Sequence, residues 1–207
     1  MRVAIPLYPR FTALDAVGPY TVLAFAPGWT VTFVAAEPGR VIDDRGMLTL
    51  AATATYADLP DPDVIIVPGG TGTFDAATDE ALLDWLRRAH ETTQWTTSVC
   101  SGSLLLGEAG LLGGLKATSH WSVMDLLRQY DSEPVTERVV VEGKIVTAGG
   151  VSAGIDMALT LLAQASGVKI AEAVQLAIEY DPQPPLNAGS LRTAPEGTRD
   201  LALTMIT

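Results

Sequence analysis

The sequence predicts an α/β sandwich, a single domain in which helices cover a mostly parallel sheet. Short apolar runs alternate with helical patterns along the chain, as expected of consecutive strand–helix units. The run over 63–67 is apolar after its first residue, which is typical of a parallel strand buried on both faces. With 207 residues, 48% of them apolar, the chain can form one large core, and no repeat or linker divides it.

In the first half of the chain, apolar runs, some rich in β-branched and aromatic residues, predict strands, and helical patterns lie between them. The clearest helical pattern places Leu82, Trp85, Leu86 and Ala89 on one face. The last strand of this half ends at Pro68-Gly69-Gly70-Thr71-Gly72, which predicts a tight turn. The strands are expected over residues 2–8, 29–35, 47–51 and 63–67, and the helices over 15–25 and 79–91.

The second half continues the alternation and ends in a different composition. Glu142-Gly143 predicts the turn of a hairpin, and Gly167 predicts the end of a buried helix. From Asp181 onward prolines and small polar residues predict an ordered arm followed by a fraying tail. The strands are expected over 95–99, 138–141 and 144–147, and the helices over 101–109, 122–130, 155–162 and 170–177.

Composition excludes several classes of function. The 24 acidic and 13 basic residues give a net charge of −11, which disfavours nucleic acid and anionic membrane surfaces as partners. Five glycines interrupt the most apolar stretch, 98–115, so it does not predict a membrane span, and Pro6 interrupts any export signal. One cysteine and two histidines cannot form a structural zinc site. We therefore expect a cytoplasmic protein with a reduced thiol, a small-molecule substrate and no cofactor.

Cys100 is the first candidate for chemistry. It directly follows the predicted strand 95–99 and precedes a predicted helix, and ligands bind at the carboxyl ends of such strands. A sharp strand-to-helix turn would direct its side chain into the crevice. The N-terminus of the following helix would favour the thiolate. The alternative is that Cys100 is a small buried apolar residue without chemistry.

The glycine-rich turn at 68–72 ends a neighbouring strand and should face the same crevice. Its glycines would allow backbone N–H groups to approach a ligand and stabilise a developing negative charge. A plain connecting turn is the alternative. A phosphate-binding loop is disfavoured because no Lys-Ser/Thr pair follows at the required spacing.

Two titratable residues complete the candidates. Asp15 opens the first predicted helix, where it could serve only as a capping carboxylate or could share a proton with Cys100, with Asp15 as the protonated member. His120 begins another helical run and could be purely structural. No histidine directly follows Cys100, so the arrangement of a cysteine peptidase is absent at that position.

Together these segments resemble the ThiJ/PfpI superfamily, which has a class I glutamine amidotransferase-like fold, and within it the isocyanide (isonitrile) hydratase branch. The resemblance implies a three-layer α/β/α sandwich over 1–207 with a flavodoxin-like sheet and a proline-rich arm from about 181. The segments that carry it are Leu14-Asp15 with Gly18-Pro19, and the stretches 67–72, 97–104, 117–121, 149–156 and 179–190.

The resemblance also implies an activity and a site. The activity would be hydration of an isonitrile to an N-substituted formamide through a cysteine thioimidate, in a homodimer without a cofactor. Cys100 would be the nucleophile, Asp15 the acid and His120 an accessory residue. The family usually has threonine after the nucleophile, where this chain has a serine with freer rotamers. Residues expected to bind substrate or an oxyanion are Gly70, Thr71, Ser101, Gly150 and Val151.

Two other functions fit the same residues. A cofactor-free glyoxalase would use Cys100 and Asp15 on small reactive carbonyl compounds. A redox or ligand sensor of the same fold would use the thiol without turnover, because an activated thiol at a helix N-terminus oxidises readily. The same fold also forms the effector domain of some transcription regulators, which usually continue into a DNA-binding domain.

Overall fold

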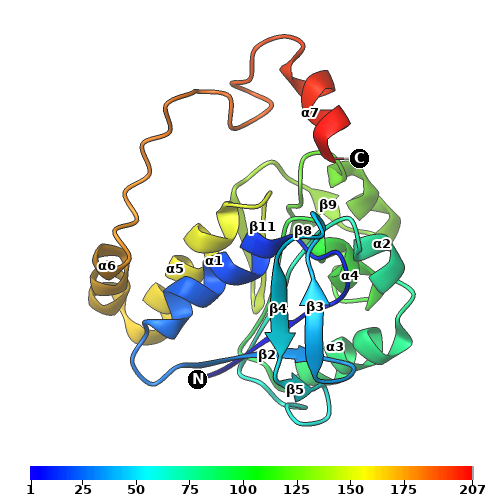
Figure 1. Cartoon of the computed structure of the whole chain (residues 1–207), viewed down its shortest axis with the longest axis vertical. Helices are drawn as coiled ribbons and strands as arrows, with labels where there is room; N and C mark the ends of the chain where they lie inside the picture. Colours follow the sequence, from blue (N-terminus) through cyan, green and yellow to red (C-terminus); the bar gives the residue numbers. More distant parts are fainter. Residues whose placement is uncertain (207) are drawn as a thin grey trace.

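The computed structural model describes residues 1–206, and within them a seven-stranded sheet forms the centre of the molecule (Figure 1). All neighbouring strands are parallel except β10 and β11, which form the expected hairpin. The α/β fold class predicted from the sequence is therefore confirmed. In sheet order the strands are β10 (Val139–Glu142), β11 (Ile145–Ala148), β7 (Trp95–Val99), β6 (Val64–Val67), β1 (Arg2–Pro6), β2 (Thr30–Ala35) and β5 (Ala54–Thr55).

The central strands bring the functional segments to one edge of the sheet. All four residues of β6 are fully buried, as expected of a strand covered on both faces. β6 pairs in parallel with β7, with Val67 opposite Ser98, so Pro68 and Cys100 follow at neighbouring strand ends. β1 lies on the other side of β6 and leads toward Asp15 at the same edge.

Helices cover both faces of the sheet and produce the three layers. On one face α1 (Ala13–Ala24) packs against α5 (Ala153–Ser166), which also contacts α6 (Val168–Ala177). On the other face α4 (Gly102–Glu108) contacts α2 (Thr73–Ala76), α3 (Glu80–Thr92) and the 3₁₀ helix η1 (Met124–Tyr130). The sequence predicts an α-helix at 122–130, where the structure has this tighter helix instead.

Two small sheets stand beside the main one. β3 (Gly39–Ile42) pairs antiparallel with β4 (Thr49–Ala52), which is the extra strand expected near 47–51. β8 (Lys116–Ala117) pairs with β9 (Glu133–Pro134). None of the helices within residues 1–206 is both long enough and apolar enough to cross a membrane.

The C-terminal segment differs from the expectation. The arm leaves the body after α6, and the chain then returns as α7 (Thr198–Ile206), so the predicted fraying tail is wrong (Figure 1). Once the last proline, Pro195, is passed, apolar residues recur at helical spacing at Leu201, Ala202, Met205 and Ile206. Arg45 Nη1 donates to the carbonyl oxygen of Met205 at 3.1 Å, which ties the end of α7 to the body.

Candidate active site

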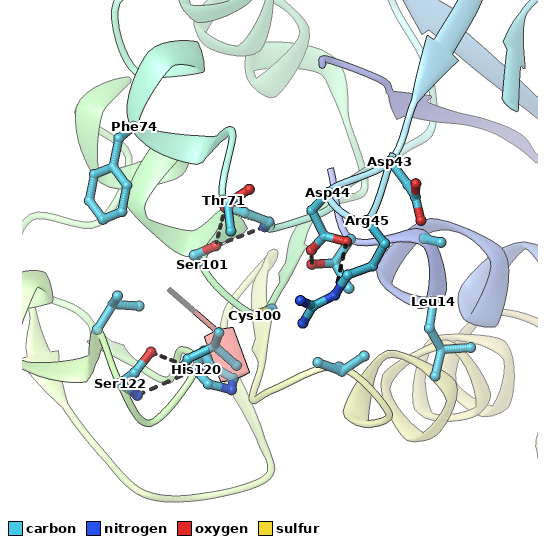
Figure 2. A pocket seen from close by; sticks show the side chains of 16 residues that line it. Leu14, Asp43, Asp44, Arg45, Thr71, Phe74, Cys100, Ser101, His120 and Ser122 are labelled. Atoms are coloured by element: carbon cyan, nitrogen blue, oxygen red, sulfur yellow. Dashed lines mark hydrogen bonds and ion pairs between the residues drawn. The ribbon is translucent and has the colours of Figure 1, made fainter. Parts of the chain in front are cut away.

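A cavity of about 390 Å³ lies at the carboxyl edge of the sheet and is lined by most of the predicted residues, but not by Asp15 or Gly150 (Figure 2). Cys100 and Ser101 line it from the end of β7, and Gly70 and Thr71 line it from the end of β6. His120 and Val151 complete the predicted part of the wall. The other lining residues are Thr12, Ala13, Leu14, Asp43, Asp44, Arg45, Phe74, Ser122, Val123 and Ile206.

Cys100 occupies the sharp turn between β7 and α4. Its φ is 59°, in the left-handed region that non-glycine residues seldom adopt. The turn is held because the Cys100 N–H donates to the carbonyl oxygens of Ala148 and Gly149, at 3.0 and 3.1 Å. It also requires glycine at position 102, where a Cβ would lie 2.2 Å from the Val67 carbonyl oxygen. The strained turn predicted at Cys100 is present.

The surroundings of the thiol favour its protonated form. Burial raises the pKa of Cys100 strongly, and the nearby Asp15 carboxylate raises it further. The backbone N–H groups of Ser101 and Val151 donate toward the sulfur and lower the pKa, but their effect is smaller. The backbone donors at the helix N-terminus therefore favour the thiolate, as expected, but loss of solvation opposes them and has the larger effect.

Asp15 lies in the first turn of α1 and is fully buried. Its Oδ2 accepts a hydrogen bond from the Gly69 N–H at 2.9 Å, while Oδ1 has no nitrogen or oxygen partner within residues 1–206. Burial raises the pKa of Asp15 to about 7, against the opposing influence of the Gly69 N–H and the Cys100 thiol. Asp15 and Cys100 thus form a coupled buried pair that can exchange one proton. The expectation that Asp15 is the protonated member is wrong, because burial keeps the pKa of the thiol above that of the carboxyl group.

The glycine loop is packed too tightly for side chains. A Cβ at Gly69 would lie 2.5 Å from the Ser101 nitrogen, and one at Gly72 would lie 1.9 Å from the Pro9 carbonyl oxygen. The Gly70 N–H, expected to face an oxyanion, donates to Ser101 Oγ at 3.0 Å. This donor is therefore already engaged by the Ser101 hydroxyl group.

The remaining predicted residues surround the thiol from the other side. Val151 has φ 39°, a conformation in which its N–H is directed at the Cys100 sulfur. Gly150 lies against the His120 ring, since a Cβ there would be 2.4 Å from His120 Cδ2. His120 Nδ1 is 2.7 Å from Ser122 Oγ, and burial lowers the pKa of His120, so the ring is neutral at neutral pH. Thr71 lies exposed at the rim.

Several site residues were not predicted from the sequence. Thr73 and Tyr8 lie behind Ser101. The Thr73 hydroxyl group is hydrogen-bonded both to the Tyr8 hydroxyl group and to that of Ser101. Asp44, Arg45 and Ile206 line the cavity from segments far from the motifs. Thr73 follows the glycine loop directly, so its polar side chain was a usable signal. Ile206 carried no such signal.

The described residues offer no site for a metal ion. Across residues 1–206 no three His, Cys, Asp or Glu side chains come together as a group that could hold one.

Comparison with known proteins agrees with the geometry. Residues 1–164 match the DJ-1/PfpI family. The chain belongs to the DJ-1/PfpI family. The resemblance to ThiJ/PfpI proteins drawn from the motifs is thereby confirmed.

Individual DJ-1/PfpI relatives refine this placement. An isonitrile hydratase from Pseudomonas putida is 45% identical over 202 residues, covering 98% of this chain and 88% of that protein. The transcriptional regulator CdhR from Pseudomonas aeruginosa is 33% identical over 140 residues, 67% of this chain and 41% of the regulator.

Solved structures of the DJ-1/PfpI family show the same architecture. A ThiJ/PfpI family protein from Pseudomonas syringae superposes with a TM-score of 0.95 at 40% identity, covering 99% of this chain and 85% of that one. DJ-1beta from Drosophila melanogaster superposes with a TM-score of 0.78 at 20% identity, over 87% of this chain and 98% of that one, and so supports the fold alone.

Proposed function

We propose that this protein is an isonitrile hydratase, which adds water to an isonitrile, R–N≡C, and releases an N-substituted formamide. The observation that carries the proposal is the buried pair of Cys100 and Asp15, in which Asp15 Oδ1 has no nitrogen or oxygen partner among the residues that the structure describes. An isonitrile carbon must accept both a nucleophile and a proton, and this pair can supply both. The 45% identity with the Pseudomonas putida isonitrile hydratase supports the same activity.

The first half of the reaction forms a thioimidate. Above the pKa of Asp15 the pair holds one proton, mainly on the thiol. As the sulfur attacks the isonitrile carbon, this proton passes to Asp15, and Asp15 delivers it to that same carbon. The product is R–N=CH–S–Cys100, and no proton is gained from or lost to solvent.

The second half hydrolyses the thioimidate. Water adds to the carbon bonded to sulfur, and its proton is carried by Asp15 to the substrate nitrogen. Collapse of the tetrahedral intermediate, R–NH–CH(OH)–S–Cys100, breaks the carbon–sulfur bond and releases R–NH–CHO, while the proton of its hydroxyl group passes to the Cys100 sulfur. The backbone N–H groups of Ser101 and Val151, which already face the sulfur, stabilise it as a leaving group.

The cavity suits a neutral, apolar substituent on the isonitrile nitrogen. Leu14, Phe74, Val123 and Ile206 line it, and Phe74 is 56% exposed and so available to an incoming ring or alkyl group. We infer an aryl or alkyl isonitrile as the class of substrate.

A rate assay tests the proposal. Purified protein is mixed with an aryl or alkyl isonitrile and formamide production is followed, with Cys100→Ala as the control and methylglyoxal as the competing substrate. We expect formamide from the wild type and none from the variant. Loss of methylglyoxal without formamide would instead assign a glyoxalase that uses the same pair. If neither substrate is consumed, Cys100 is better explained as a sensor thiol.

We further infer a homodimer located in a compartment that keeps Cys100 reduced, such as the cytoplasm. Large apolar side chains are exposed on several helices and on the arm, which favours burial against a second copy. They include Phe25, Val168, Leu176, Leu186 and Leu191. Light scattering on the purified protein tests the dimer, and a monomer at micromolar concentration would contradict it.

A further inference from the structure

A chain of three buried hydroxyl groups lies behind the nucleophile, and the mechanism above does not use it. Tyr8 Oη is 2.6 Å from the Pro68 carbonyl oxygen and 3.2 Å from Thr73 Oγ1. Thr73 Oγ1 is in turn 2.8 Å from Ser101 Oγ. All three side chains are buried, and only Ser101, at the outer end of this hydroxyl chain, lines the cavity next to Cys100.

The inner end of the hydroxyl chain fixes the direction of its hydrogen bonds. A carbonyl oxygen can only accept, so the single proton of Tyr8 is donated to Pro68. The bond between Tyr8 and Thr73 then requires Thr73 as its donor, and the bond between Thr73 and Ser101 requires Ser101 as its donor. The other acceptor within reach of the Ser101 proton, the Gly70 carbonyl oxygen, is farther away at 3.4 Å.

Ser101 Oγ therefore has one hydrogen-bonding position left. Its proton points inward to Thr73, and one lone pair accepts the Gly70 N–H at 3.0 Å. A hydroxyl oxygen has two lone pairs, so a single acceptor position remains for a molecule in the cavity. Serine lacks the second Cβ substituent that restricts the rotamer of threonine, so these contacts are what hold the hydroxyl in this orientation.

We propose that Thr73 and Tyr8 are positioning residues that hold the Ser101 hydroxyl as the hydrogen-bond acceptor for the water that hydrolyses the thioimidate. This inference rests on the proposed function. The water would donate one hydrogen bond to Ser101 Oγ while its oxygen bonds to the carbon attached to the sulfur of the adjacent Cys100. No proton passes to Ser101, so the proton transfers remain those of Asp15.

If Thr73 positions the Ser101 hydroxyl group in this way, replacing Thr73 should slow only the hydrolysis of the thioimidate. Thr73→Val removes the inner acceptor of the Ser101 proton, and we expect kcat and KM to fall together by about tenfold with kcat/KM little changed, because only the step after thioimidate formation is slowed. The covalent thioimidate should then accumulate during turnover. Mass spectrometry of acid-quenched enzyme would detect it as a mass increase equal to one intact isonitrile. Thr73→Ser keeps the hydroxyl and should restore both kcat and the low level of adduct.

A matched control separates this role from general loss of packing. Thr93 is also buried, and its hydroxyl lies 2.8 Å from the Thr96 hydroxyl, but it precedes β7 and is remote from the cavity. Thr93→Val should leave kcat and adduct level unchanged. In a Ser101→Ala background, Thr73→Val should cause no further loss. A second tenfold loss in that background, or slower formation of the adduct in place of slower hydrolysis, would overturn the proposal.

A measurement without turnover tests the orientation itself. Neutron diffraction from crystals of the deuterated wild type should place the Tyr8 deuteron toward Pro68, the Thr73 deuteron toward Tyr8 and the Ser101 deuteron toward Thr73. A Ser101 deuteron directed into the cavity would overturn the proposal even in an enzyme that makes formamide. Failure of the proposed function would show separately, as absence of formamide from the wild type.

Discussion

Asp15 is a carboxyl group from which water is almost fully excluded. Its ionised form keeps hydrogen bonds from the Gly69 N–H and the Cys100 thiol, and these only partly replace hydration. The pKa of about 7 that follows places its titration within the range in which enzymes operate. Because the Cys100 thiol titrates well above that range, Asp15 decides whether the pair holds one proton or two near neutral pH.

The pH dependence of the reaction should follow this pair. Below pH 7 Asp15 is protonated and cannot take the thiol proton, so we expect kcat/KM to rise as pH increases through about 7. Asp15→Asn should keep the fold, lose at least 100-fold in turnover and show no such rise. Steady-state assays between pH 5.5 and 8.5, at about ten values, would measure this. A variant with a near wild-type rate would remove Asp15 from the mechanism.

The same carboxyl group should also make stability depend on pH. Its pKa is raised in the folded state, so between about pH 4 and pH 7 the native protein holds a proton that the unfolded chain has released. The contribution of Asp15 to the free energy of unfolding therefore decreases as pH rises across this interval, by ~4 kcal/mol at most. Urea denaturation at several pH values should show this decrease in the wild type but not in Asp15→Asn. Parallel curves for the two proteins would contradict the raised pKa.

Among the helices, α3 allows a prediction about stability that does not involve the reaction. The Asp79 side chain caps its N-terminus by accepting from the N–H groups of Ala81 and Leu82, at 3.0 and 3.2 Å. Asp79→Ala should lower the free energy of unfolding by about 1 kcal/mol and leave kcat unchanged, because α3 does not reach the cavity. Denaturation and steady-state assays on one preparation would check both. A loss of activity would show that α3 is coupled to the site.

The terminal helix α7 should influence substrate binding. Ile206 lines the cavity, and Arg45, which is mostly exposed, donates to the carbonyl of Met205 beside it. Arg45→Met removes that bond, and we expect KM for a bulky isonitrile to rise several-fold while kcat stays within about twofold. Arg87→Met is the matched control, since Arg87 is an exposed arginine on α3 paired with Glu80 and Asp84. Equal effects of the two variants would exclude a specific role for Arg45.

The elements that could be predicted from the sequence are those with a clear period. The buried strands and the amphipathic α3 appear within one or two residues of their expected bounds, because apolar spacing alone specifies them. β3 could not be found this way, since it is largely exposed and depends on pairing with β4. The 3₁₀ geometry of η1 is likewise decided by packing, and its apolar spacing only indicates a helix.

The same distinction, between local pattern and tertiary packing, applies to the residues of the site. Cys100 and Asp15 could be predicted because a strand end and a helix start are visible in the sequence, and parallel strands bring both to the same edge of the sheet. The orientation of Ser101 could not, because its partners Thr73 and Tyr8 are brought to it by the parallel order of β1, β6 and β7. The raised pKa of Cys100 was also missed, since it depends on how completely the folded protein excludes water.

At the scale of the whole molecule, the sheet order joins distant parts of the chain. β1 is the first strand in the sequence, yet it lies between β2 and β6 in the sheet. The cavity is lined by segments at residues 12–14, 70–71, 100–101 and 151, which are far from one another in the sequence. Such a site has no local precursor, and its formation requires the complete sheet.

The accessibility of the single cysteine of the chain can therefore be used to follow folding. Cys100 is the only thiol, and it is buried at the edge where β6, β7 and β11 end together. Contacts between residues far apart in sequence form slowly, whereas helices such as α3 and α5 can begin from local contacts. On dilution from urea, helical circular dichroism should recover before the thiol becomes protected from a disulfide reagent. Simultaneous recovery would instead mean that the sheet and the helices form in one cooperative step. In either case the reactivity of Cys100 measures when the site forms, and no added label is needed.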